Sequence, residues 1–454
     1  MEVDRKGFWG RLLSILSAIS ESHFVSIDLE LSGVTSKAPG GQGRKTSLEE
    51  KYLETKGAAE RYTILQVGIT CAYQNLETNT YVLRPYNFNI NPSFEEKLDL
   101  ERIFSFQSGA VDFLLSHNFN LSLPFTHGVP YLSRNEAKYA KQLAKDRFEQ
   151  KNEISDIQLN ENDVQSRAFY ARVREEIKTW LETGKPNSAF LFVQGVTPPG
   201  EPEPLGMADL TSFERRLVHQ LVRAEFPDYK SITRLGQIKI FKLDPVREEG
   251  FRRARYEGTK ERIARQTGFR WIIEALTGSD MKRIDIKNFA VDPETGAPAS
   301  RDLGQLRGEF GRVKDAIIRR RPVIVGHNMF TDLLYIYKTF IGSLPDTVTE
   351  FAEEVHKLFP NIVDTKWLAT QAEGDNPGAS DLQTMDEKLS SLSVPKIGMC
   401  STCNHLSTTH RAAIILSRFG CTLKRHTRTP KWSRQTVTPE RSTLRSKVND
   451  SIQC

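Results

Sequence analysis

Apolar residues in the first part of the chain change their spacing several times, and each change predicts a different element. Residues 5–21 carry apolar side chains at helical spacing and predict a helix. Phe24–Leu31 is rich in β-branched and large apolar residues and predicts a strand that ends at Ser32-Gly33. We expect a polar loop over residues 35–50, strands at Leu65–Ala72 and Asn79–Arg84, and a looser stretch from Pro85 to Asn91.

The middle of the chain is predicted to hold a small module between two charged helical stretches. Residues 135–184 are highly charged with helical spacing and are expected to form a connector. Residues 248–265 carry interleaved Arg and Glu, which is typical of a solvated bridging helix. Between the two, the pattern predicts a strand, an amphipathic helix and a further strand region, at Ala189–Gln194, Leu210–Phe226 and Ser231–Leu243.

Beyond Phe269 the pattern returns to alternating helices and strands. We expect helices to reach Leu276, to cover Leu306–Arg321 and Asp346–Phe359 and to begin at Met385–Leu392, with strands at Pro322–Val325 and Asn361–Thr365.

Strands alternating with helices on both sides of a module predict an α/β fold with an insertion. We therefore expect a mixed sheet flanked by helices, built from residues 1–145 and 265–392. A small α+β module over 150–250 would interrupt it, and a basic tail over 395–454 is expected to be disordered.

Composition favours a folded protein of a reducing compartment. Hydrophobic residues make up 38% of the 454 positions, and no apolar run reaches the roughly 18 residues of a membrane span. Arg11 interrupts the apolar stretch from Phe8 to Ile19, which favours an opening helix over a signal peptide. Five cysteines in a chain of this length do not form a disulfide framework, so we expect the nucleus or cytoplasm. Because no apolar run is long enough, we also expect no membrane partner.

The positive net charge is confined to the end of the chain. The formal charge is +6, but residues 396–454 hold eleven Lys and Arg against two acids. The remaining 52 basic and 55 acidic residues give the rest of the chain a slight negative charge. Affinity of the chain's main body for a nucleic acid must therefore come from local basic patches.

Two acids within the first predicted strand form the sharpest chemical signal. Side chains two apart on a strand project from the same face, so Asp28 and Glu30 point to one place. Two carboxylates brought together in apolar surroundings need a counter-charge, which a divalent cation with oxygen ligands supplies. The alternative is an amphipathic strand whose polar face meets water.

A third acid follows the predicted strand at Pro322–Val325. That strand leads into Gly326-His327-Asn328, where Asn328 could cap the next helix and Asp332 would lie one turn into it. This places Asp332 near the strand ends. The alternative is a surface Asp near a helix N-terminus, where the helix dipole favours it.

Several phrases together resemble the poly(A)-specific ribonuclease family over roughly residues 1–390. The opening Phe24–Gly33 has its counterpart there, with Leu29 and Leu31 in place of the usual Gly and Phe. The other phrases are Ser108-Gly-Ala-Val-Asp-Phe-Leu114, His127-Gly-Val-Pro-Tyr-Leu132, Gly326-His-Asn-Met-x-x-Asp332 and Phe359-Pro-Asn-Ile-Val-Asp-Thr-Lys366. The resemblance implies a ribonuclease-H-like fold and an exonuclease with four acids, of which Asp28, Glu30 and Asp332 are the first three.

The resemblance also implies the reaction and its partners. Two Mg²⁺ ions about 4 Å apart would be held by the carboxylates and would hydrolyse RNA from its 3′ end, releasing 5′-AMP from poly(A) tails. It further implies a homodimer and makes Lys366 an RNA-binding residue.

The inserted module carries a second signal for RNA. Arg215 and His219 stand four apart on the predicted helix, so they share one face and could meet a phosphate or base. The alternative is a surface Arg beside a packed His.

The fourth acid of the family, expected in a His followed five residues later by Asp, is missing after Leu389. One reading is an active deadenylase in which Asp381 or Asp386 replaces it. The other is a catalytically impaired relative that binds A-rich 3′ ends without cleaving them. A DNA-directed exonuclease is a third reading.

The segment after Pro395 departs from the resemblance and is rich in Ser, Thr, Arg and Cys. It is typical of a different exon, a retained intron or a frame error, or of a basic RNA-binding arm. Cys400, Cys403, His410 and Cys421 could hold zinc, although their spacing matches no common zinc finger.

Overall fold

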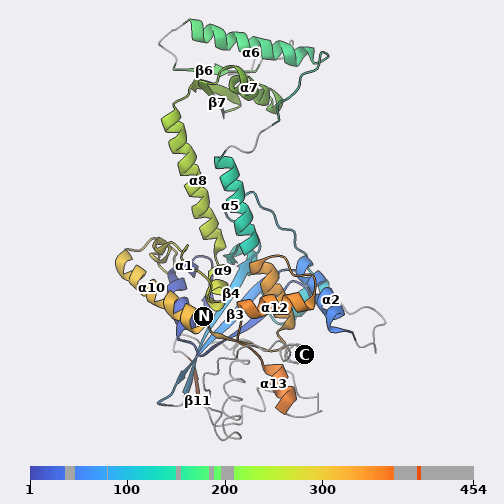
Figure 1. The fold of residues 1–454 in the computed structure, drawn as a ribbon, viewed down its shortest axis with the longest axis vertical. Helices are drawn as coiled ribbons and strands as arrows, with labels where there is room; N and C mark the ends of the chain where they lie inside the picture. Colours follow the sequence, from blue (N-terminus) through green and yellow to red (C-terminus); the bar gives the residue numbers. More distant parts are fainter. Residues whose placement is uncertain are drawn as a thin grey trace, which may run out of the picture. The chain divides into compact units, whose positions relative to one another are not determined.

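The computed structural model describes residues 1–35, 46–78, 80–149, 155–183, 189–195, 209–372 and 396–399. The chain divides into two compact units. The first consists of Met1–Gln142 and Lys260–Cys454, and the second of Leu143–Thr259 (Figure 1).

A mixed sheet forms the centre of the first unit. The strands β4 (Thr80–Asn91), β3 (Ile64–Asn75) and β2 (Phe24–Leu31) form an antiparallel meander. Beyond β2, β9 (Val323–Gly326) and then β10 (Ile362–Asp364) are added in parallel. The short strands β1 (Glu2–Val3), β5 (Val129–Pro130) and β11 (Lys396–Met399) all pair with β4. The predicted mixed sheet flanked by helices is therefore confirmed.

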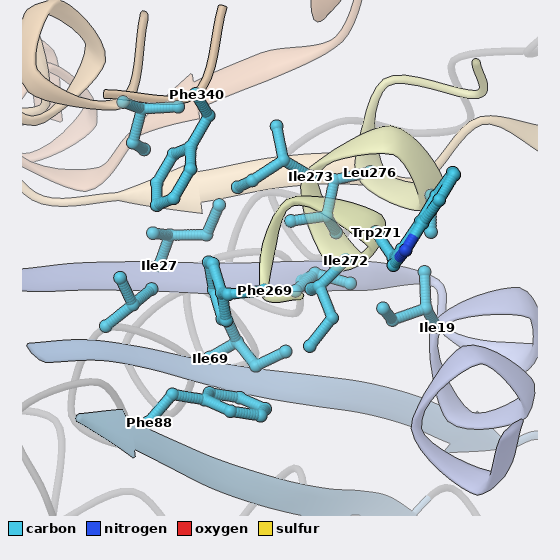
Figure 2. Packing of buried hydrophobic residues seen from close by; sticks show 14 of the residues in the cluster. Ile19, Ile27, Ile69, Phe88, Phe269, Trp271, Ile272, Ile273, Leu276 and Phe340 are labelled. Carbon is cyan, nitrogen blue, oxygen red and sulfur yellow. The ribbon is translucent and has the colours of Figure 1, made fainter. Parts of the chain in front are cut away.

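Helices flank this sheet and bury one of its faces. Strand residues such as Ile27, Ile69 and Phe88 pack against Phe269 and Phe340 in the main core (Figure 2). The helices of the unit are α1 (Phe8–Glu21), α2 (Leu48–Arg61), α3 (Ser108–Ser116), α4 (Leu123–Thr126), α9 (Arg270–Leu276), α10 (Leu303–Arg320), α11 (Phe330–Ile336), α12 (Val348–Leu358) and α13 (Thr365–Ala372), with shorter turns η1 (Ile286–Phe289) and η2 (Tyr337–Ile341). Helices α5 (Arg134–Phe148) and α8 (Pro245–Thr267) continue from one unit into the other.

The second unit is a three-stranded antiparallel sheet with two helices. Its strands run in the order β6 (Phe190–Val193), β8 (Gln237–Lys242), β7 (Tyr229–Arg234). Helices α6 (Val164–Glu182) and α7 (Ser212–Glu225) share a hydrophobic core with that sheet. The second half of the expected connector over 135–184 is therefore a core helix of this unit, because Val173 and Ile177 are buried in it.

Two expectations about the first strands and loops were wrong. The looser stretch Pro85–Asn91 belongs to β4, because Pro85 lies where neither β11 nor β1 pairs along the far edge and its missing N–H is not needed. The polar loop expected over 35–50 gives way to helix α2 at Leu48. A capping box between Ser47 and Glu50 starts that helix.

The segment that we expected to be a tail contributes β11 to the sheet. The predicted helix start at Met385–Leu392 and the zinc hypothesis at Cys400 lie outside the described residues. Among the residues that are described, none of the helices combines the length and apolar character needed to cross a membrane.

Candidate active site

Strand β2 presents Asp28 and Glu30 on one face of the sheet. The residues between and before them, Ile27 and Leu29, are buried in the main core on the opposite face. The carboxylates therefore share the face on which Phe24 forms a small second cluster with residues of β3, β4 and β9. The first four residues of β2 are buried on both faces of the sheet. Because side chains alternate along a strand, the two acids near its end lie on the same face.

Parallel pairing brings the third acid to the same edge. Ser26 of β2 pairs with Val325 of β9, so both strands end at the same edge of the sheet. Helix α11 follows β9 directly and carries Asp332 in its first turn. The hydroxyl of Tyr335 on α11 donates a 2.7 Å hydrogen bond to the carbonyl of Gly33, just past the end of β2. This bond fixes the helix beside the strand that carries the first two acids.

The turn that leads into α11 is held by Asp364 and not, as expected, by a cap from Asn328. The Asp364 carboxylate accepts hydrogen bonds from the backbone N–H groups of Asn328 (3.0 Å) and Met329 (2.8 Å). It also accepts one from Lys366 (2.9 Å) at the start of α13. Asn328 makes no side-chain cap and has a positive φ of 59°. The half-buried Asp364 carboxylate therefore ties the two strand-to-helix turns together.

The electrostatics show that the acids lie in one another's field. Burial, together with the charge of Asp28, raises the pKa of Glu30 to about 7. Burial raises the pKa of Asp332 well above its usual value, and the charges of Asp28, Asp364 and Glu30 add to this effect. Burial and the like charges thus outweigh the groups that favour the charged forms of Glu30 and Asp332. The arrangement is thus suited to receive positive charge.

The donor set fits a hard divalent cation, because carboxylate oxygens are the ligands that Mg²⁺ prefers. Within the described ranges, however, no group of three or more His, Cys, Asp or Glu side chains is arranged to hold a metal ion. Asp381 and Asp386, the expected substitutes for the missing fourth acid, lie outside those ranges.

His117 is a site residue that the sequence reasoning missed. Its positive charge lowers the pKa of Glu30 and so opposes the larger effect of burial. Its Nδ1 lies 2.8 Å from the carbonyl oxygen of Phe113, and its ring packs on the Phe113 ring with centroids 4.2 Å apart. The signal was the spacing of four between Phe113 and His117, which places both on one side of α3.

Helix α3 is held beside the end of β2 by the residue before it. The N–H of Gln107 donates to the carbonyl of Ser32, and its side-chain oxygen accepts a bond from the N–H of Val34. These contacts explain how residues of α3, far from Glu30 in sequence, reach the same edge of the sheet.

An apolar cavity of about 300 Å³ lies next to the turn that Asp364 holds. Met329 and the α11 residues Phe330 and Leu333 form one part of its lining, and residues of α12, β10 and α13 form most of the rest. Asp364 and His356 are the polar exceptions in this lining.

The predicted RNA-binding residues are placed as follows. Both ring nitrogens of His219 face hydroxyls of β7, with Nδ1 2.8 Å from Ser231 Oγ and Nε2 3.1 Å from Thr233 Oγ1. Arg215, one turn earlier, donates to Ser212. The geometry of His219 is that of the packed alternative. Lys366 lies at the start of α13, directly after the turn at Asp364.

Comparisons with known proteins show the family to which the chain is similar. A family model described as CAF1 family ribonuclease matches residues 3–414. An uncharacterized protein of Schizosaccharomyces pombe is 26% identical over 371 residues, which cover 81% of this chain and 75% of that protein. The poly(A)-specific ribonuclease PARN of Arabidopsis thaliana is 27% identical over 384 residues, covering 81% of this chain and 51% of PARN.

Among solved structures, the Mg²⁺- and Mn²⁺-bound form of Pop2p from S. pombe aligns with a TM-score of 0.37 and 10% identity, covering 94% of this chain and 92% of that one. The chain spans about half the length of the PARN relatives that it matches. The expected resemblance to poly(A)-specific ribonucleases is confirmed. The chain belongs to the CAF1 family of ribonucleases.

Proposed function

We propose that the chain is a 3′-exoribonuclease that removes poly(A) one nucleotide at a time and releases 5′-AMP. The observation that carries the proposal is the shared field of Asp28, Glu30 and Asp332 at one edge of the sheet. Family membership and the PARN relatives support RNA as the substrate class.

Asp28, Glu30 and Asp332 would hold the divalent cations, and we propose Mg²⁺ as the natural one. When bound, such cations supply a water of lowered pKa and neutralise charge on the phosphodiester. The chain's own residues set the geometry. Tyr335 and Asp364 hold α11 next to the end of β2, which would bring Asp332 towards Asp28 and Glu30.

The neighbours of the acids have roles of their own in this proposal. His117 stands close enough to Glu30 to influence its charge, and its Nε2 makes no hydrogen bond to the described residues. Lys366 lies in the first turn of α13, beside the turn at Asp364, where an ammonium group would attract the RNA backbone. The resemblance makes a homodimer part of the proposal, and the nucleus or cytoplasm its expected location.

A second candidate function is RNA binding without cleavage. The observation that favours it is the missing His-x4-Asp sequence after Leu389, together with the lack of a metal-holding group of three acids in the described part of the chain. Fewer acids would leave the charge of bound cations and phosphate less well balanced.

One experiment separates these functions. The purified chain is incubated with a 5′-fluorescein 20-nucleotide oligo(A) and Mg²⁺, and the products are resolved on a denaturing gel. We expect a ladder that shortens from the 3′ end, with 5′-AMP as the mononucleotide product. The Asp28→Asn and Asp332→Asn variants should bind the same RNA but leave it intact.

Other outcomes have distinct meanings. Binding without shortening by the wild type supports the second function, and equal shortening of oligo(dA) indicates the DNA-directed exonuclease. An Asp332→Asn variant as active as the wild type would contradict the proposed site.

A further inference from the structure

The outer face of the three-stranded sheet in the second unit carries an unusual set of side chains. Along β6, Leu191 and Val193 pack into the unit's core, so Phe190 and Phe192 project from the other face. Along β8, the core residues Ile238 and Ile240 alternate with outward-facing Gln237, Lys239 and Phe241.

Strand register gathers these side chains into adjacent rows. Phe190 pairs with Phe241, which pairs in turn with Lys230 of β7. The next row joins Phe192, Lys239 and Ile232, and the last joins Gln237 to Arg234. Neighbouring strands lie about 4.8 Å apart, so each row forms a continuous strip across the sheet.

The described side chains of this face are exposed (Phe190, Arg234) or half-buried (Phe192, Ile232, Lys239, Phe241). Neither the three phenylalanines nor Ile232 belongs to any of the hydrophobic core clusters, and Phe190 is 37% exposed. Large apolar side chains gathered on an exposed surface mark an interaction site.

The charge of the face is positive. No Asp or Glu occurs in β6, β7 or β8. The Lys239 ammonium lies 3.7 Å from the centroid of the Phe190 ring and 5.9 Å from that of Phe192. Arg234 is exposed at the end of the hairpin, and Lys230 pairs with Glu248. Rings combined with cations fit an anionic, aromatic ligand better than an apolar protein surface.

The face is distinct from the Arg215 and His219 pair. His219 lies on α7 and contacts Ser231 and Thr233, the β7 residues that alternate with Lys230, Ile232 and Arg234. A ligand on the outer face would therefore touch neither of the residues that the sequence singled out.

We propose that this outer face, formed by Phe190, Phe192, Lys239, Phe241 and Arg234, binds single-stranded RNA. Bases would stack on the phenylalanine rings, and Lys239 and Arg234 would contact phosphates, as in sheet-based platforms for single strands. The proposal rests on the proposed function only for the identity of the polymer. It adds a second contact for the RNA, outside the nuclease unit.

The test measures RNA binding by the full chain without catalysis. Fluorescence anisotropy of a 5′-fluorescein 20-nucleotide oligo(A) is recorded in EDTA for the wild type and for Phe190→Ala/Phe192→Ala. We expect the double variant to bind at least about fivefold more weakly, the lower limit for loss of a stacked base. Lys239→Gln should bind more weakly and show a smaller dependence of Kd on salt.

The matched control is Phe251→Ala on α8. Phe251 is also exposed (53%) and also lies beneath a cation, Arg247 at 5.5 Å, but it belongs to α8 and not to the sheet. Its removal should leave Kd unchanged. Circular dichroism melting verifies that each variant is folded.

The outcomes separate the two proposals. Unchanged RNA binding by a folded Phe190→Ala/Phe192→Ala variant overturns the outer-face proposal, even if the chain shortens oligo(A). If this variant instead loses self-association in light scattering and keeps its RNA affinity, the face docks protein and the proposal is likewise overturned. Weaker binding in EDTA supports it even if the chain cleaves no RNA.

Discussion

Replacing Glu30 by Gln should stabilise the metal-free protein, and the gain should depend on pH. The substitution keeps the size of the side chain and removes its charge. Burial and the neighbouring Asp28 raise the pKa of Glu30 from 4.5 to about 7 in the folded chain. The charged form therefore opposes folding at pH values above about 7.

The size of the effect follows from this pKa. One pKa unit corresponds to about 1.4 kcal/mol, so the rise amounts to ~3 kcal/mol. Allowing for the partial exposure of the side chain, we expect about 2 to 3 kcal/mol. Because the folded pKa is raised, the wild type loses this stability as the pH rises from the unfolded value near 4.5 to about 7. The Gln variant should gain the full amount at pH 8 and less than about 1 kcal/mol at pH 5.

The assay is urea unfolding in EDTA, followed by tryptophan fluorescence, with the transition of the first unit fitted separately. Glu77→Gln, in the exposed turn after β3, is the control and should change the free energy of unfolding at neither pH. A Glu30→Gln variant that is destabilised at pH 8, or equally stabilised at both pH values, would refute the reasoning that Glu30 is buried beside Asp28.

Three further predictions concern stability. Arg102→Met should cost about 3 kcal/mol or more in urea unfolding, because it leaves the largely buried Glu136 carboxylate without the arginine that donates two hydrogen bonds to it. The double variant Arg102→Met/Glu136→Gln should recover part of this loss, and equal stability of the single and double variants would be inconsistent with this. Gly326→Ala should lower the free energy of unfolding by about 1–3 kcal/mol and slow RNA shortening, since the added Cβ would lie 2.3 Å from Cγ of the buried Met329. An unchanged melting temperature would count against this packing. Burial and two arginines lower the pKa of His219, so protonation favours unfolding and the wild type should lose thermal stability as the pH falls below about 6.5. His219→Gln should remove this loss, and a wild-type melting temperature that is independent of pH between 7.5 and 5.5 would contradict this.

The parts of the fold that sequence predicts best are those whose local pattern agrees with their tertiary setting. Strand β2 has the predicted limits because its apolar run is buried on both faces at its start and turns polar at Asp28 and Glu30. The helices α7, α10 and α12 follow their amphipathic spacing. Helix α2 could also have been found, since Ser47 and Glu50 form a capping signature in the sequence.

Other features depend on contacts that local pattern does not contain. Pro85 breaks the strand pattern of β4, and only the pairing of its neighbours shows that its missing N–H is harmless. The effect of His117 on Glu30 needs α3 to be anchored at Ser32, a contact between segments far apart in sequence. The role of Asp364 likewise appears only when β9 and β10 lie side by side. A site of three acids could be proposed from resemblance, whereas the bonds that hold α11 beside the end of β2 could not.

The most direct test of the proposed site is a titration of the purified chain with Mn²⁺ followed by electron paramagnetic resonance, which reports free and bound ion separately. We predict that the wild type binds Mn²⁺, that Mg²⁺ displaces it, and that Asp332→Asn weakens binding as strongly as Asp28→Asn. If Asp332→Asn binds Mn²⁺ like the wild type while Asp28→Asn does not, the two acids do not serve one site, and the proposed nuclease centre is wrong.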